Sequence, residues 1–110
     1  MSIEQLAKID AVGIDKVTKD VILTITDHMD WENIEEHLVL LQDKLNLYID
    51  FYESGKLYKV YPHYKGKKII FDIVGKFSPP EEGENFYAKA RSFLSEIGID
   101  LRFIHYSGEP

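Results

Sequence analysis

The sequence predicts an α+β domain, a two-layer sandwich in which two helices cover one face of a four-stranded sheet. Three observations predict this class: short runs rich in β-branched residues, two longer segments with helical periodicity, and their order, β-β-α-β-α-β. A chain of 110 residues suits one domain. We therefore expect residues 1–110 to form a single unit with an ordered core at about 9–106.

The first two elements form a predicted hairpin. The runs "IDAVGID" and "VILTITD" are typical of short strands, and the polar turn "KVTKD" joins them. In the second run, Val21, Leu23 and Ile25 fall on one face of the strand. This alternation predicts a strand that is buried on one side.

A long helix is predicted next, because apolar residues from Trp31 to Tyr52 recur at spacings of three and four. Asp30 is placed to cap its start, and Gly55 to end it. The apolar stripe is wider than contact with one sheet requires, so we expect part of it to meet another helix or another subunit. Segment 57–61 fits a helical turn or an edge strand, and we treat it as a loop.

The remaining elements complete the sheet. "KKIIFDIVGKF" is apolar on both faces, which indicates a central strand in which Asp72 is available to pair with Arg102. A second helix lies within "SPPEEGENFYAKARSFLSEIG", where Ser78 and Glu81 have the spacing of a capping box. A last strand, "IDLRFIHYS", follows it. The predicted inward stripe of the second helix comprises Phe86, Ala90, Phe93, Leu94 and Ile97.

Composition excludes several function classes. There are no cysteines, so thiolate chemistry and disulfides are ruled out. The longest apolar runs have four residues, whereas a transmembrane helix needs roughly 20. The start "MSIEQLAKID" has no basic segment followed by an apolar one, so we expect a cytoplasmic protein. A net charge of −6 argues against general binding to nucleic acid or to membranes.

The junction "TDHMDW" brings candidate metal ligands close together in sequence. Asp27, His28 and Asp30 could bind a metal with water completing the shell. Their spacing does not fit one helical face, and His37 is too far along the chain for a paired-histidine motif. We favour a structural junction in which Trp31 anchors the helix, with metal or small-ligand binding as the alternative.

The Lys56–Lys68 segment is basic in an otherwise acidic chain. Lysines alternate here with tyrosines in "YKVYPHYKGKK", a pattern that suits single-stranded nucleic acid or an acidic protein partner. Lysines beside an apolar strand also act as gatekeepers against aggregation, and we favour that reading. Weak nucleic-acid binding is a further alternative.

No motif for catalysis is present, so we expect neither an enzyme nor a cofactor. The leading hypothesis is a non-enzymatic protein-interaction module that associates with itself or acts as an immunity-type inhibitor of a basic protein. Its partner would be a protein or a second copy of the chain, not a membrane. The candidate contact residues are aromatic anchors and one histidine: Trp31, His37, Tyr48, Tyr52, Tyr61 and Tyr64.

The chain also resembles a family of small bacterial domains of unknown function. The resemblance rests on "IDAVGID", "LTITDHMDW", "HLVLLQDKLNLYIDFYESGKL" and "YPHYKGKKIIFDIV", which share a hairpin, an Asp-x-x-Asp-Trp junction and a long helix, and it covers residues 9–104. It implies a bacterial, cytosolic, single-domain protein. It transfers no catalytic residue to this sequence.

Overall fold

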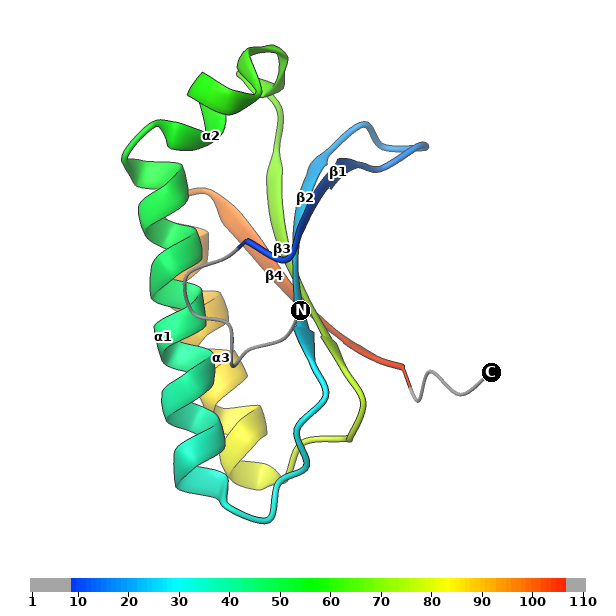
Figure 1. Ribbon diagram of the computed structural model, residues 1–110, viewed down its shortest axis with the longest axis vertical. Coiled ribbons are helices and arrows are strands. Elements are labelled where there is room, and N and C mark those ends of the chain that lie inside the picture. Colours follow the sequence, from blue (N-terminus) through cyan, green and yellow to red (C-terminus); the bar gives the residue numbers. More distant parts are fainter. Residues whose placement is uncertain (1–8, 107–110) are drawn as a thin grey trace.

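The computed structural model describes residues 9–106 and confirms the predicted α+β class (Figure 1). The segment on which the cytoplasmic expectation rests lies largely outside these residues. In chain order the elements are β1 (Ala11–Ile14), β2 (Val21–Asp27), α1 (Ile34–Glu53), α2 (Lys56–Val60), the short 3-10 helix η1 (Pro62–Tyr64), β3 (Ile69–Gly75), α3 (Glu81–Glu96) and β4 (Ile99–His105).

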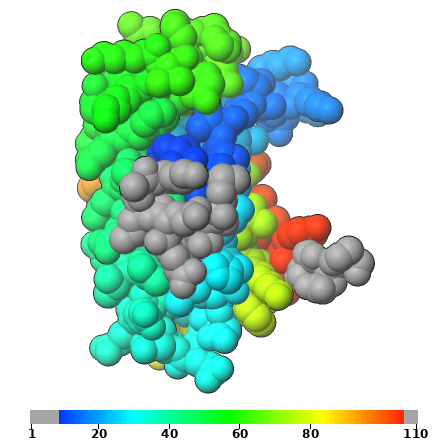
Figure 2. All heavy atoms as spheres, in the orientation of Figure 1, coloured from blue at the N-terminus to red at the C-terminus, as the bar shows by residue number. Residues whose placement is uncertain are grey.

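The sheet has the order β1-β2-β3-β4. β1 pairs antiparallel with β2, whereas β2, β3 and β4 run parallel. α1 and α3 pack side by side on one face of this sheet and start at the same end of the molecule (Figure 1). The β1–β2 hairpin projects away from the helices (Figure 2). The predicted layer arrangement is therefore confirmed.

The pairing of residues between neighbouring strands determines which side chains lie on each face of the sheet. Three rows of paired residues face the helices and form the core: Val21, Ile69 and Ile99; Leu23, Phe71 and Leu101; Ile25, Ile73 and Phe103. On the opposite face Thr24, Asp72 and Arg102 form one row. The Arg102 Nε and Nη2 atoms each donate to Asp72 over 2.7 Å, as the sequence predicted.

α1 begins at Ile34, so the prediction that Asp30 caps this helix was wrong. Asn33 is the N-cap, and its side chain accepts a hydrogen bond from the Glu36 amide at 3.1 Å. The Asp30 carboxylate instead accepts from the Glu32 amide, and the Asp30 carbonyl accepts from His37 Nδ1 at 2.9 Å. If the helix began earlier, the Asp30 carbonyl would accept a hydrogen bond from a backbone amide of the helix and not the one from His37.

Segment 57–61 is largely helical and not the loop that we predicted, because α2 covers Lys56–Val60. Gly55 ends α1 as expected, with a φ of 85° that turns the chain back. This turn buries Leu57 completely against the core. Pro62 then stops the helix. Five residues are too few to show helical periodicity in a sequence.

The second helix also starts later than its capping pattern indicated. α3 begins at Glu81 after Pro80, and no side-chain hydrogen bond caps it. The Ser78 hydroxyl lies instead 3.5 Å from Nδ1 of His105, the last residue of β4. The predicted capping box is therefore absent at this described helix start.

Candidate functional site

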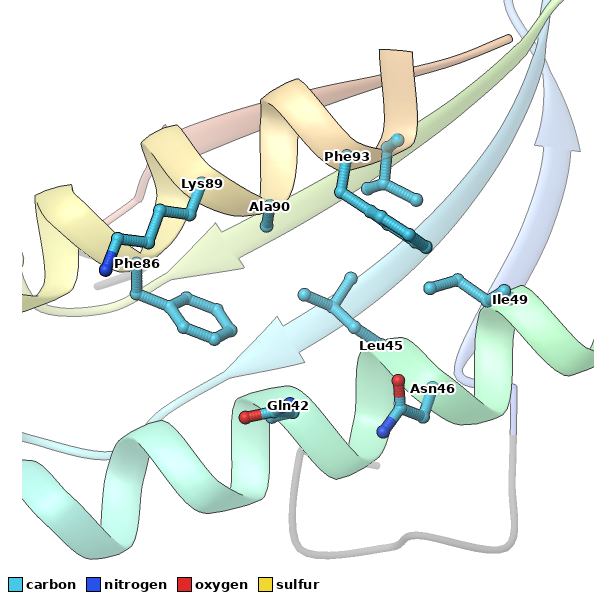
Figure 3. Close-up of a pocket in the computed structure, with 9 residues that line it drawn as sticks. Gln42, Leu45, Asn46, Ile49, Phe86, Lys89, Ala90 and Phe93 are labelled. Atoms are coloured by element: carbon cyan, nitrogen blue, oxygen red, sulfur yellow. The ribbon is translucent and has the colours of Figure 1, made fainter. Parts of the chain in front are cut away.

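An apolar groove lies between α1 and α3 (Figure 3). Its volume is about 370 Å³. Side chains from both helices point into the space between them, and none comes from the sheet. The lining residues are Gln42, Leu45, Asn46 and Ile49 from α1, and Phe86, Lys89, Ala90, Phe93 and Leu94 from α3.

Helical spacing places these residues on one stripe of each helix. The α1 residues follow the pattern i, i+3, i+4, i+7, and so do the first four residues from α3. Leu45 and Leu94 are buried and form the floor of the groove, whereas the Phe93 side chain is 54% exposed. The groove therefore offers an exposed aromatic ring above a closed apolar base.

The outward position of Phe93 corrects one sequence expectation, which placed this ring in the inward stripe of the second helix. Leu94 is buried as the sequence predicted, and Phe86, Ala90 and Ile97 pack against the core, but Tyr87, which the prediction left out, is buried as well. Tyr87 stacks on Phe103 of β4, with ring centroids 5.2 Å apart. The Phe86–Phe93 stripe consequently faces sideways, toward α1.

The chemistry of the groove suits binding more than catalysis. Its walls are mainly aliphatic and aromatic, with two amides, Gln42 and Asn46, and one charged group, Lys89. Among these lining residues there is no carboxylate, histidine, hydroxyl or thiol, and the Lys89 amine is the one group of a type that can serve as a general base or a nucleophile. What the groove provides is apolar area with a few polar groups at its edge.

The position of α1 is fixed by a buried ion pair. Lys44 is fully buried, and its Nζ lies 3.0 Å from Asp10 Oδ1. Asp10 also accepts a hydrogen bond from the Thr26 amide at 3.0 Å. Breaking such a pair leaves a buried charge uncompensated, which is strongly destabilising. This network holds the inner side of α1 against the first two strands.

Tyr48 belongs to the same network and is not a surface anchor. Its hydroxyl donates to the Thr24 carbonyl and accepts from the Asp10 amide at 2.7 Å. Burial raises the pKa of Tyr48 well above its usual range. Because the side chain is fully buried, it is unavailable to a partner, contrary to its role as a candidate contact residue.

The Asp27–Trp31 junction is also structural. The His37 Nε2 atom lies 2.5 Å from Asp27 Oδ2, and the histidine is fully buried. Nδ1 lies 2.9 Å from the Asp30 carbonyl and must donate to it, since a carbonyl only accepts. Trp31 stacks on the histidine ring with centroids 3.6 Å apart. This set of contacts ties the end of β2 to the start of α1.

The candidate metal ligands are not brought together. Asp27 turns inward to His37, His28 is exposed, and the Asp30 carboxylate binds a backbone amide. Among residues 9–106, no group of three or more His, Cys, Asp or Glu side chains could hold a metal ion. The geometry gives the metal alternative no support.

The aromatic residues near the Lys56–Lys68 segment pack on one another. Tyr61 and Tyr64 stack with centroids 4.8 Å apart, and Tyr64 is buried. Tyr52 makes an edge contact with Tyr58 at 6.3 Å. Lys68 Nζ lies 2.8 Å from the Asp100 carboxylate, which raises the lysine's pKa. Rings paired in this way do not form the open stacking platform that single-stranded nucleic acid uses.

Sequence reasoning thus missed the residues that form the groove. Ile49, Phe86, Lys89 and Phe93 were absent from the candidate contacts, which favoured tyrosines. The signal that could have found them was the excess width of the apolar stripe on the first helix. It indicated contact with another helix or subunit, and the helix it faces is α3 of the same chain.

Comparison with known proteins identifies a family and no activity. A model of a family of unknown function, DUF6572, matches residues 1–107. No curated protein and no solved structure was found to match the chain. Within the part of the chain that the structure describes, no helix is both long and apolar enough to cross a membrane.

Proposed function

Because the chain belongs to the DUF6572 family, whose function is unknown, we propose from its geometry that it is a non-enzymatic protein-interaction module. The partner binds in the α1–α3 groove. One observation carries the proposal: the groove exposes Phe93 over a buried apolar floor, on the helical layer that covers the sheet. Aromatic anchors in such pockets supply much of the binding energy of protein interfaces.

The buried polar networks support this role by keeping one wall of the groove rigid. Lys44 and Tyr48 hold α1 to the strands, and His37 holds its first turn to the end of β2. A partner that binds a preformed surface loses less conformational entropy on binding. An inhibitor that covers a basic surface of its target is one role of this kind. On the resemblance alone, we propose that the protein acts in the cytoplasm of a bacterium.

The test is to compare what the wild type and two groove variants bind. Phe93→Ala removes the exposed ring, and Ala90→Trp fills the groove. Val17→Ala is the matched control, because Val17 is 88% exposed on the hairpin, away from the helices. Each full-length protein is immobilised, incubated with lysate of cells that contain it, and analysed by quantitative mass spectrometry.

We expect a stoichiometric protein that is retained by wild type and Val17→Ala and lost from both groove variants. The loss for Phe93→Ala should be at least tenfold in affinity once the partner is purified, as expected for a hot spot. Equal retention by all four proteins, or turnover of a small molecule that depends on the groove, would overturn the proposal.

A further inference from the structure

We propose that the occupant of the groove is a basic amphipathic helix of a protein partner. This inference rests on the proposed function and narrows it to one class of partner. It is carried by the nature of the groove walls and by the distribution of charge along α1 and α3.

The walls favour a helix over an extended peptide. Both are helices whose backbone groups bond within the helix, so the groove has no strand edge to pair with an extended chain. A helix satisfies its own backbone and needs only side-chain contacts. From Gln42 to Ile49 the groove spans about two helical turns, or roughly 10 Å, which fits anchors at i, i+3, i+4 and i+7.

The exposed charges of α1 are all acidic. Within Ile34–Glu53, which the structure describes in full, the only lysine or arginine is Lys44, which is buried against Asp10. The exposed acidic residues of α1 are Glu35, Glu36, Asp43, Asp50 and Glu53. On α3 the Arg91 Nε atom donates to the Leu101 carbonyl, so this side chain turns toward β4. Lys89 is then the only basic group that lines the groove.

Helix stability explains the acidic residues at one end of the groove and not those at the other. Carboxylates in the first turns of α1 and α3 are favoured by the helix macrodipole. At the C-terminal ends the macrodipole disfavours negative charge, yet Glu53 and Glu96 lie there, and neither helix has a basic residue in its last turn.

These two carboxylates also continue the groove stripes. By helical spacing Glu53 lies on the stripe of Asn46 and Ile49, and Glu96 on that of Lys89 and Phe93. The next lysine, Lys56, lies beyond Gly55 on α2 and, among residues 9–106, forms no ion pair with Glu53. Glu53 and Glu96 therefore place negative charge at the C-terminal ends of both groove helices, which suits lysine or arginine side chains on the bound helix.

The same charges argue against a second copy of the chain on this surface. Two copies facing each other through α1 and α3 would bring together helices whose exposed charges are mainly acidic. Like charges at an interface are unfavourable and suppress that pairing. A partner with a basic polar face meets no such repulsion.

Three synthetic peptides of one length test the inference. They share an apolar face with Leu and Phe at i, i+3, i+4 and i+7, and their polar faces carry lysine, glutamine or glutamate. Binding to the full-length protein is measured by fluorescence polarisation at several salt concentrations. Wild type is compared with Phe93→Ala, with Ala90→Trp and with the Val17→Ala control.

We expect the lysine peptide to bind at least tenfold more tightly than the glutamine peptide at low salt, and this advantage to shrink as salt rises. Both groove variants should weaken its binding, whereas Val17→Ala should not. Lysine-peptide binding that survives in both groove variants would overturn the inference, because it would be general attraction to an acidic protein.

Neutralising Glu53 and Glu96 tests whether the lysines of the peptide contact the C-terminal ends of α1 and α3. Glu53→Gln with Glu96→Gln should weaken the lysine peptide about two- to fivefold for each charge removed. The matched pair Glu35→Gln with Glu82→Gln, at the opposite end, should change affinity less. Equal losses from the two pairs would overturn the assignment of this end.

The outcomes separate this inference from the proposed function. Equal binding of the lysine and glutamine peptides, lost in the groove variants, would refute a basic partner and leave a protein-binding groove. If no peptide binds while the groove-dependent protein is recovered from lysate, the occupant is not a helix of this kind. If neither binds, both proposals fail.

Discussion

Two buried tyrosines differ in how their hydroxyl groups are satisfied. The Tyr48 hydroxyl bonds to the Thr24 carbonyl and the Asp10 amide. The Tyr87 hydroxyl has no hydrogen-bond partner among the described residues, although the side chain is only 1% exposed. Removing the two hydroxyls should therefore have different effects on stability.

We expect Tyr48→Phe to lower the free energy of unfolding by about 1–3 kcal/mol, because it removes the hydrogen bond to the Thr24 carbonyl and the one from the Asp10 amide. Tyr87→Phe should leave stability unchanged or raise it by about 1 kcal/mol, since it removes an unsatisfied polar group. Urea denaturation followed by fluorescence of the single tryptophan, Trp31, measures both. A greater loss for Tyr87→Phe than for Tyr48→Phe would contradict the assignment.

Both tyrosines also predict instability in alkali. Burial raises the pKa of each hydroxyl in the folded state above its ordinary value of about 10. The folded state thus holds protons that the unfolded state releases, so stability is complete below pH 10 and falls as the pH rises further. Melting temperatures between pH 8 and pH 11 should drop less for Tyr87→Phe than for wild type. Parallel curves would refute this prediction for Tyr87.

At the scale of elements, local pattern predicted the strands and most of both long helices. β2 was predictable because alternate burial gives its apolar residues a period of two in the sequence. β3 was predictable because residues on both of its faces are buried. The predicted helix starts were wrong where the expected capping residue makes other contacts. Asp30 and Ser78 both have the right chemistry, but Asp30 is used by Glu32 and His37, and Ser78 lies near His105.

The junction between α1 and α2 gives a clean test of backbone conformation. Gly55 has a φ of 85°, and an added Cβ would meet nothing within 4 Å. Gly55→Ala should therefore cost about 1–2 kcal/mol through conformation alone. Gly13→Ala is the control, because Gly13 also has open space but lacks a positive φ. Equal unfolding free energies for the two variants would show that the left-handed turn carries no cost.

At the scale of the whole molecule, the sequence predicted that the wide apolar stripe of the first helix meets another helix or subunit, but it did not identify the residues that form the groove. Phe86, Ala90 and Phe93 have the spacing of an inward stripe, and only packing of Tyr87 and Leu94 on the sheet turns that stripe sideways. Tyr48 has the size and chemistry of an interface anchor. Its hydroxyl instead bonds to two backbone groups inside the molecule, which the sequence does not reveal. These facts depend on contacts between residues far apart in the sequence.

Charge on the helical layer predicts the oligomeric state. We expect a monomer at neutral pH, because self-association through α1 and α3 would oppose mainly acidic surfaces. Sedimentation velocity at low and moderate salt measures this directly. Any dimer would contradict this prediction, and the response of that dimer to Ala90→Trp would show whether the groove or another surface forms its interface.

The two-walled construction of the groove has a consequence during synthesis. One wall is complete when Glu53 has left the ribosome, but the other belongs to α3, which ends at Glu96, near the end of the chain. A nascent or truncated chain that lacks α3 shows the apolar stripe of α1 without its opposite wall. Partner binding through this groove therefore reports that the chain has been made and folded through α3.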